Sequence, residues 1–353
     1  MLKTFSYDNI SIKDIQIYKG ESMLAQGKIL RNVLIMNMDK QLEDISMKIY
    51  RKGISELNLE EAYIVVVCMT KRLMETFICS LGEKKLYYIS AYFEKGKFLE
   101  NNLRNLGIYD ILEGVLISKG QELSLIEKVE EEYIGKSSSF GRTSEAFFEQ
   151  LRKNGLPGEA IGIRTIRRYE DRDKITESYE KEKSWLVKTE NKFQLCLNCV
   201  KAQAVLYDMD VVGEDKEIYR YRIFDLEIED GIMLEEKKIY YKYFLVSGAV
   251  KLILQEMREK HYDLRKMDEY AQIRFDDKYL AFVIPELIRI LVDEKAFPLE
   301  EAIEIAGRIC GYPDLKKMEE AISQCPIEFV DVLVPKLRET MMKLMIKKED
   351  EQV

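Results

Sequence analysis

Helix-like and strand-like segments alternate along this chain, and the alternation constrains its fold more than any other feature. Asn58 and Glu61 have the spacing of a helix capping box, and apolar residues recur after them with a helical period to about residue 80. Residues 86–92, LYYISAY, then combine aromatic and β-branched side chains between charged and glycine-containing stretches, as strands do. With no internal repeat, this order of elements predicts an α/β fold.

Two later segments also predict strands, around residues 194–208 and 217–228. The second alternates polar and apolar side chains in IYRYRIFDLEI, which favours a half-exposed edge strand or a hairpin. From residue 240 onward the apolar pattern becomes largely helical.

Proline and aspartate mark the ends of the later helices. Pro285 and Pro298 stand where the first turn of a helix tolerates proline. Asp314 is expected to cap a further helix, which Pro326 closes. The charge-rich stretch 167–183 is expected to be an exposed loop or helix with a solvated face.

Composition restricts the class of partner. With 55 Lys and Arg against 63 Asp and Glu, the net charge of −8 repels nucleic acid and anionic membrane surfaces. The longest strongly apolar run, residues 62–69, is far too short to span a bilayer. Six cysteines without a framework spacing indicate reduced thiols. We therefore expect a soluble cytoplasmic protein that binds neither nucleic acid nor membrane.

Cys196 and Cys199 have the CxxC spacing but lie in a strand-like run, where residues i and i+3 point to opposite faces. With no second pair and no neighbouring histidine, they cannot complete a tetrahedral zinc site. We therefore interpret both cysteines as structural and predict no metal site.

Four separated segments carry longer motifs. They are YYISAYFEKGKFL at residues 87–99, FGRTSEAFFEQLRKNGLPGEAIGIR at residues 140–164, VKAQAVLYDMDVVG at residues 200–213, and a stretch beginning FDDKYLAFVIPELIRILVD at residues 275–314. In the same order they resemble segments of the amino-terminal domain of glycogen phosphorylase, the last resembling the motif LNDTHPALAIPELMRILVD. The resemblance covers about residues 58–336.

The resemblance implies one Rossmann-like α/β domain over residues 1–353, with a twisted, mainly parallel sheet flanked by helices. In the family, the lysine that forms a Schiff base with pyridoxal phosphate lies in a second domain, which this sequence does not match. We therefore expect no cofactor in this chain, and pyridoxal phosphate only if a separate partner chain supplies it.

In the family a glycine-rich loop, GLGNGGLGR, brings backbone N–H groups close to phosphate and sugar. The corresponding segment here is IGKSSSFGR, residues 134–142, in which only Gly141 stays in register. A serine forced into a left-handed turn costs about 1–2 kcal/mol, and its Cβ fills the space of a ligand oxygen. The resemblance therefore predicts a degenerate phosphate and sugar pocket made of Lys136, Ser137, Ser138, Ser139, Phe140, Gly141, Arg142, Asp277, Tyr279 and Leu315.

Other interpretations of residues 134–142 remain open. Lys136, Arg142 and the serine hydroxyls are able to hold a phosphate. Alternatively the segment is a polar surface turn whose Ser139 caps a helix. A Walker loop is disfavoured, because Glu130 occupies the position of its first glycine.

Two histidines of the family are replaced. One falls on Tyr279, and the sugar-contacting one falls on Leu315, which neither donates nor accepts a hydrogen bond. The one histidine of the chain, His261, lies outside the matched motifs, and we interpret it as a surface residue. Asp276 and Asp277 are adjacent, so on a strand they face opposite ways and do not form an acid and base pair.

The connection between residues 225 and 240 is short where the family carries a long helical excursion. The resemblance assigns dimer contacts and a gating loop to that excursion, so both are expected to be missing.

We favour a non-catalytic homologue, a pseudoenzyme that binds a protein partner or a carbohydrate and regulates carbohydrate metabolism. Two alternatives stay open. One is half of a split phosphorylase, a glycosyltransferase. The other is a different enzyme on the same scaffold, using residues such as Ser138, Asp276, Asp277 and Tyr279.

Overall fold

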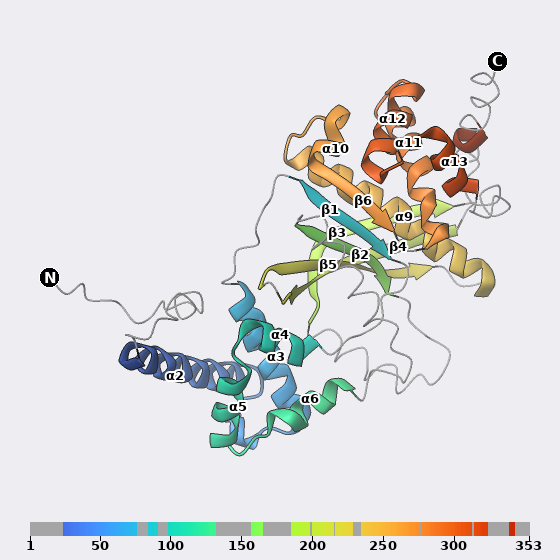
Figure 1. The fold of residues 1–353 in the computed structure, drawn as a ribbon. Helices are drawn as coiled ribbons and strands as arrows, with labels where there is room; N and C mark the ends of the chain where they lie inside the picture. Colours follow the sequence, from blue (N-terminus) through green and yellow to red (C-terminus); the bar gives the residue numbers. More distant parts are fainter. Residues whose placement is uncertain are drawn as a thin grey trace.

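A six-stranded sheet forms the centre of the described part of the protein (Figure 1). The computed structural model describes residues 24–75, 84–90, 98–131, 157–164, 185–197, 200–214, 216–228, 234–275, 277–312, 314–323 and 339–342. The strands are β1 Lys85–Ser90, β2 Gly158–Arg164, β3 Val187–Leu197, β4 Val200–Val212, β5 Ile218–Ile228 and β6 Ala271–Phe275.

The strand order is β3-β4-β5-β2-β1-β6. Strands β5, β2, β1 and β6 run parallel to one another, whereas β3 and β4 form an antiparallel hairpin whose strand β4 pairs antiparallel with β5. The mostly parallel sheet, covered by helices, confirms the α/β class expected from the sequence.

Helices from the first part of the chain cover one face of the sheet, below it in Figure 1. They are α2 Leu24–Ile49, α3 Leu59–Glu75, α4 Phe98–Leu106, α5 Tyr109–Ser118 and α6 Leu123–Glu131, with the 3-10 turn η3 Ile54–Glu56. The other face is covered by helices from the second part of the chain, above the sheet in Figure 1. They are α9 Leu234–Glu259, α10 Met267–Tyr270, α11 Val283–Asp293, α12 Leu299–Cys310 and α13 Leu315–Ser323, with the turns η4 Leu264–Lys266 and η5 Lys278–Phe282.

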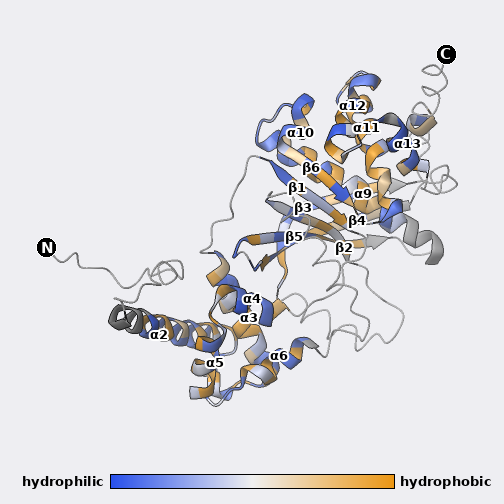
Figure 2. Ribbon diagram, in the orientation of Figure 1, coloured by the Kyte–Doolittle hydropathy of each residue, from blue (hydrophilic) through white to orange (hydrophobic). Residues whose placement is uncertain are grey.

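Strand β1 shows why the sheet needs helices on both faces. Leu86 and Tyr88 point into the core beneath α2 to α6, whereas Tyr87 and Ile89 point into the core beneath α9 to α13. Successive side chains of a strand alternate between faces, so a strand that is apolar on both sides is stable only in the middle layer. Figure 2 shows hydrophobic colour along parts of β6, α9 and α11, while β1 and β5 also carry hydrophilic colour.

The capping box at the start of α3 is confirmed. The Asn58 N–H donates to Glu61 Oε2 at 3.0 Å, and the Glu61 N–H donates to Asn58 Oδ1 at 2.9 Å. Each side chain thus satisfies a backbone donor that the first helical turn leaves without a partner. The expected helix is described as far as Glu75, and residues 76–80 lie outside the described part.

The strand expected over residues 194–208 is wrong as a single element. It consists of the end of β3 and most of β4, which pair antiparallel with Leu197 opposite Val200. A period of two continues across such a tight hairpin, so the alternation alone did not reveal the break. Of the cysteine pair, Cys196 lies in β3, and Cys199 lies outside the described residues.

The expected position of residues 217–228 is partly wrong. β5 does form a hairpin with β4, as one alternative required, but it is not an edge strand, because β2 pairs along its other side. Its polar side chains instead form ion pairs inside the sheet, at Arg220 and Arg222.

The expected ends of the later helices are largely confirmed. Pro285 lies in the first turn of α11, and Pro298 immediately precedes α12. The Asp314 Oδ1 atom accepts the Lys316 N–H at 2.9 Å and so caps α13. Pro326 and residues 167–183 lie outside the described part. Among the described residues, no helix has both the length and the apolar character needed to cross a membrane.

Candidate functional site

Strand β6 delivers two of the sequence-predicted site residues to the carboxyl ends of the parallel strands. Ligands of open α/β sheets bind at this edge. After Phe275 the chain turns into η5, which continues into α11. Asp277 caps η5, since its Oδ1 atom accepts the Tyr279 N–H at 2.8 Å. The turn thus holds Asp277 and Tyr279 in a defined arrangement.

Lys242 of α9 completes this group. Its Nζ atom lies 2.7 Å from Asp277 Oδ2, and the carboxyl group of Asp277 is almost fully buried. The same Nζ atom lies 3.9 Å from the centre of the Tyr279 ring, which is the geometry of a cation–π contact. One ammonium group therefore binds both the carboxylate and the aromatic ring.

A second buried group fixes α9 against α11 directly beside this pair. Glu286 is fully buried, and its carboxylate accepts the hydroxyls of Tyr243 at 2.8 Å and Ser247 at 2.9 Å. Arg289 supplies the balancing charge, with Nε 2.8 Å from Glu286 Oε2. Burial, and then the negative charge of Glu286, raises the pKa of Tyr243 well above its ordinary value, so the phenol remains a donor. This network therefore holds α9, the helix that carries Lys242, against α11.

The chemistry available to the group follows from these contacts. Both carboxylate oxygens of Asp277 accept strong hydrogen bonds, so the carboxylate is committed to holding the turn. Tyr279 is half-buried and presents an aromatic ring with a polar hydroxyl. The arrangement is suited to contact a ligand and poorly suited to move a proton.

The other sequence-predicted residues divide into two sets. Leu315 begins α13, which packs against η5, the turn that contains Tyr279, while the side chain of Leu315 is outside the described part. Residues 136–142 and Asp276 are also outside it, and their roles stay predictions.

Lys242 was not among the predicted residues. The signal that marks it is a single cation within the aromatic and apolar run YYKYFLV of α9. A cation at such a position requires a partner, because burying a charge without one is costly.

His261 lies far from this group. It is exposed and has a φ of 57° just after α9 ends, so the prediction of a surface residue is confirmed. The remaining length of α9 separates it from Lys242, about 25 Å at 1.5 Å per residue. His261 therefore does not act as a base at Tyr279.

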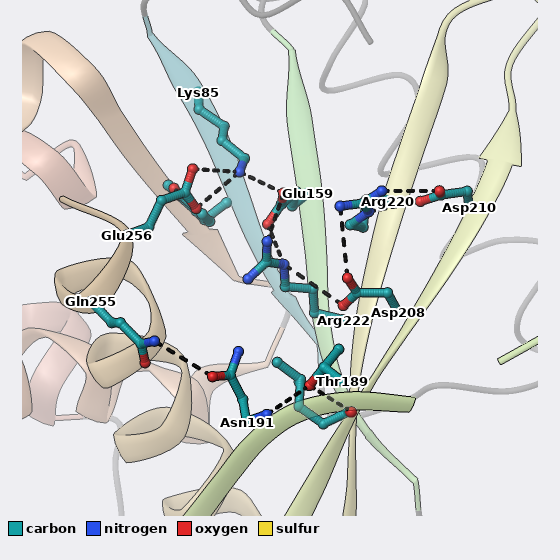
Figure 3. A network of polar contacts seen from close by, with 12 residues as sticks. Lys85, Glu159, Thr189, Asn191, Asp208, Asp210, Arg220, Arg222, Gln255 and Glu256 are labelled. Carbon is teal, nitrogen blue, oxygen red and sulfur yellow. Dashed lines mark hydrogen bonds and ion pairs between the residues drawn. The ribbon is translucent and has the colours of Figure 1, made fainter. Parts of the chain in front are cut away.

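The largest described network of charges lies at the opposite edge, near the amino ends of the parallel strands (Figure 3). Lys85 of β1 bridges Glu159 of β2 and Glu256 of α9. Arg222 of β5 lies 2.8 Å from Glu159 Oε2. Continuing across the sheet, Arg220 pairs with Asp210 of β4 at 2.8 Å.

Charges in this network compensate one another. Burial alone raises the pKa of Glu256, but Lys85, Lys260 and the hydroxyl of Tyr87 outweigh it and lower the pKa to about 2. The carboxylate therefore stays ionised as a bridging acceptor. We interpret the network as a structural clamp between β1, β2, β4, β5 and α9.

Pyridoxal phosphate, the cofactor of the family that the chain resembles, binds through a lysine, and a lysine lies at each of the two sheet edges, Lys85 and Lys242. A Schiff base requires an amine able to lose its proton beside a phosphate cradle. Lys85 bridges two carboxylates, and Lys242 is held by Asp277. Neither of these described lysines fits the cofactor.

Comparison with known proteins gives the site a family context. The family model for carbohydrate phosphorylases matches residues 233–351, which include α9, η5 and α11. Maltodextrin phosphorylase of Streptococcus pneumoniae is 30% identical over 332 residues, covering 84% of this chain and 44% of the relative. Glycogen phosphorylase of Bacillus subtilis is 26% identical over 309 residues, covering 72% of this chain and 39% of the relative.

A mammalian relative shows the same extent of similarity. The liver form of glycogen phosphorylase from Ovis aries is 23% identical over 323 residues, covering 72% of this chain and 38% of the relative. The chain thus spans less than half the length of these curated relatives. The resemblance to phosphorylases expected from the motifs is confirmed over most of the chain.

Proposed function

We propose that this relative of the carbohydrate phosphorylases is a non-catalytic protein that binds an α-glucan and acts as a binding or regulatory protein in carbohydrate metabolism. The observation that carries the proposal is the group formed by Lys242, Asp277 and Tyr279. The opposite charges of Lys242 and Asp277 form an ion pair, with 2.7 Å between Lys242 Nζ and Asp277 Oδ2. A group organised in this way orders a binding surface and offers no proton acceptor for a reaction.

Tyr279 supports the proposal that the protein is non-catalytic. The resemblance places a histidine of the family at Tyr279, and an imidazole exchanges protons near neutral pH where a phenol ring does not. Lys242 over the ring further stabilises it as a rigid aromatic surface.

The ligand class rests on the relatives and on the shape of the tyrosine. The relatives are named for glycogen and maltodextrin. An aromatic ring with a hydroxyl matches a sugar, which presents apolar C–H faces and polar hydroxyls. We therefore assign an α-glucan chain to the surface around Tyr279.

The catalytic test is direct. The purified chain, given glycogen or maltodextrin, inorganic phosphate and pyridoxal phosphate, is expected to release no glucose 1-phosphate. Release of glucose 1-phosphate by the chain alone contradicts the proposal, whatever its affinity for glucan.

The binding test uses retardation of the protein in native gels that contain glycogen. The wild-type chain is expected to be retarded, and Tyr279→Ala is expected to bind about tenfold more weakly, equivalent to about 1.4 kcal/mol. Tyr262→Ala is the matched control, because Tyr262 stacks on Tyr270 beyond the far end of α9. Equal retardation of both variants, or none for wild type, overturns the binding assignment.

A second candidate is one half of a two-chain phosphorylase. The observation that favours it is the extent of the match, 38–44% of the relatives' length. The test mixes this chain with a polypeptide that corresponds to the unmatched part of a relative and adds pyridoxal phosphate. Schiff-base absorbance together with glucose 1-phosphate supports this candidate, and the failure of both excludes it.

A further inference from the structure

A buried carboxyl group that takes no part in the proposed function joins four segments of the protein. Glu130, near the end of α6, is only 8% exposed. Its Oε1 atom accepts the Tyr63 hydroxyl of α3 at 3.1 Å and the indole N–H of Trp185 at 3.0 Å. Its Oε2 atom accepts the Leu99 N–H at 3.1 Å. The carboxyl group thus ties α3, α4 and α6 to the residue that leads into β3.

The bond to Leu99 is a helix cap. Leu99 is in the first turn of α4, whose N–H groups have no partners within the helix. A negative charge is stabilised there by the helix dipole. Glu130 itself lies in the last turn of α6, where the dipole opposes a negative charge. The two helix ends therefore act on the same carboxyl group in opposite directions.

Trp185 and Tyr63 form a hydrogen-bonded triangle with Glu130. The indole N–H of Trp185 lies 3.0 Å from the Tyr63 hydroxyl oxygen as well as 3.0 Å from Glu130 Oε1. The indole can therefore donate to either oxygen. The phenol can donate to a carboxylate or accept from a carboxylic acid, since a hydroxyl does both.

The polar and charged side chains nearest to this triangle, Tyr109 and Arg104, gather around Glu127. This residue is one turn before Glu130 in α6, and it accepts the Tyr109 hydroxyl of α5 at 3.3 Å. Arg104 of α4 lies 4.0 Å from the Tyr109 ring and pairs with Glu100. Glu127 is thus the charged side chain that acts on Glu130, and it disfavours a second negative charge.

Protonation of Glu130 is accessible in the neutral range. Burial raises its pKa to about 7, against the lowering effect of the bonds from Leu99, Tyr63 and Trp185, and Glu127 raises it further. In the unfolded chain a glutamate titrates near 4.3. Because the folded value is raised, the contribution to stability is fully present below about pH 4.3 and is lost as pH rises through about 7.

We propose that Glu130 is a proton-operated latch that changes how Trp185 is held to the helical layer. When Glu130 is ionised, Oε1 accepts both the Tyr63 hydroxyl and the indole N–H. When a proton binds to Oε1, that oxygen becomes a donor to the Tyr63 oxygen, and the indole N–H donates to the phenol. The Leu99 bond to Oε2 is kept in both states. One proton is taken from solvent and forms the O–H bond of the carboxylic acid; no other covalent bond forms or breaks, and only the hydrogen bonds among Oε1, the phenol and the indole rearrange.

The test uses a natural reporter, because Trp185 is the single tryptophan of the chain. The emission of the full-length wild-type protein is expected to show one transition near pH 7 between pH 5 and 9. Over the same range, the urea midpoint of unfolding is expected to fall as the pH rises. Glu130→Gln, which resembles the protonated state, is expected to abolish the emission transition and to flatten the pH dependence of the midpoint.

Two matched variants keep the test decisive. Glu127→Gln, on the same helix, is expected to move the transition to lower pH without abolishing it. His261→Gln removes the one histidine of the chain and is expected to leave the transition unchanged. A flat wild-type titration overturns the latch. So does a transition that survives in Glu130→Gln, or one that disappears in His261→Gln. If Glu130→Gln does not fold, an unshifted transition in Glu127→Gln overturns it.

Discussion

The two ends of the parallel strands are organised in opposite ways. At the amino ends, Lys85, Glu159 and Arg222 belong to a network that spans several strands, and each charge faces more than one partner of opposite sign (Figure 3). At the carboxyl ends, Lys242 and Asp277 form one pair beside an aromatic ring. The first arrangement joins elements of the fold, whereas the second orders one turn.

The difference shows where charges contribute most to the stability of the fold. A charge with several partners is costly to remove, because its loss leaves other buried charges without a partner of opposite sign. A single pair at the start of a helix can change during evolution with a smaller penalty to the fold. The charges at the amino edge are therefore expected to contribute more to the stability of the sheet than the pair at the carboxyl edge.

Lys85→Met tests the amino edge and has the largest expected effect. It leaves Glu159 and Glu256 buried without the cation that bridges them, and the expected loss of unfolding free energy is about 3–5 kcal/mol. Urea denaturation measures it. Lys266→Met is the control, because its pair with Glu269 is exposed, and it should change stability by no more than about 0.5 kcal/mol. Equal losses in the two variants would remove the contrast between shared and isolated charges.

Acid denaturation sharpens the comparison. The folded pKa of Glu256 is lowered to about 2, so its contribution to stability is present above the ordinary glutamate pKa of about 4.3 and is lost as pH falls toward 2. After allowance for partial solvent screening, the effect is about 2 kcal/mol. Unfolding free energies measured from pH 5 to pH 2.5 should decline more steeply in wild type than in Glu256→Gln. Parallel curves would show that the carboxylate is not held by the network.

Lys242→Met tests the carboxyl edge and should cost about 1–2 kcal/mol. The loss is smaller than for Lys85, because Asp277 keeps the hydrogen bond from the Tyr279 N–H. Urea denaturation gives the stability, and gel retardation by glycogen gives the binding. We expect weaker glucan binding at an almost unchanged fold. A loss as large as that of Lys85→Met would mean that both edges are structural.

Asp314→Ala has the smallest expected effect. It removes the cap of α13, the helix that packs against η5, and should cost about 1 kcal/mol of unfolding free energy. Asn58→Ala is the comparison at the start of α3 and should cost a similar amount. A much larger loss for Asp314→Ala would indicate that α13 is more important to the carboxyl edge than its cap alone.

Much of the local structure was predictable from the sequence. The capping box of Asn58 and Glu61, the cap at Asp314 and strand β1 all depend on residues within a few positions of one another. The strand expected at Asp277 is wrong, because β6 ends at Phe275 and Asp277 caps η5. The hairpin between β3 and β4 was missed, because alternation has the same period on both sides of a tight turn.

The sequence by itself determined the α/β class, strand β1 and the starts of α3, α11, α12 and α13. The tertiary structure alone decided that β5 lies inside the sheet, that Lys242 reaches Asp277 across 35 residues, and that Tyr63, Leu99 and Trp185 converge on Glu130. The physical reason is the separation along the sequence between the groups that interact. Caps and periodicities arise from neighbouring backbone groups, whereas these contacts exist only once the helical layers have packed on the two faces of the sheet.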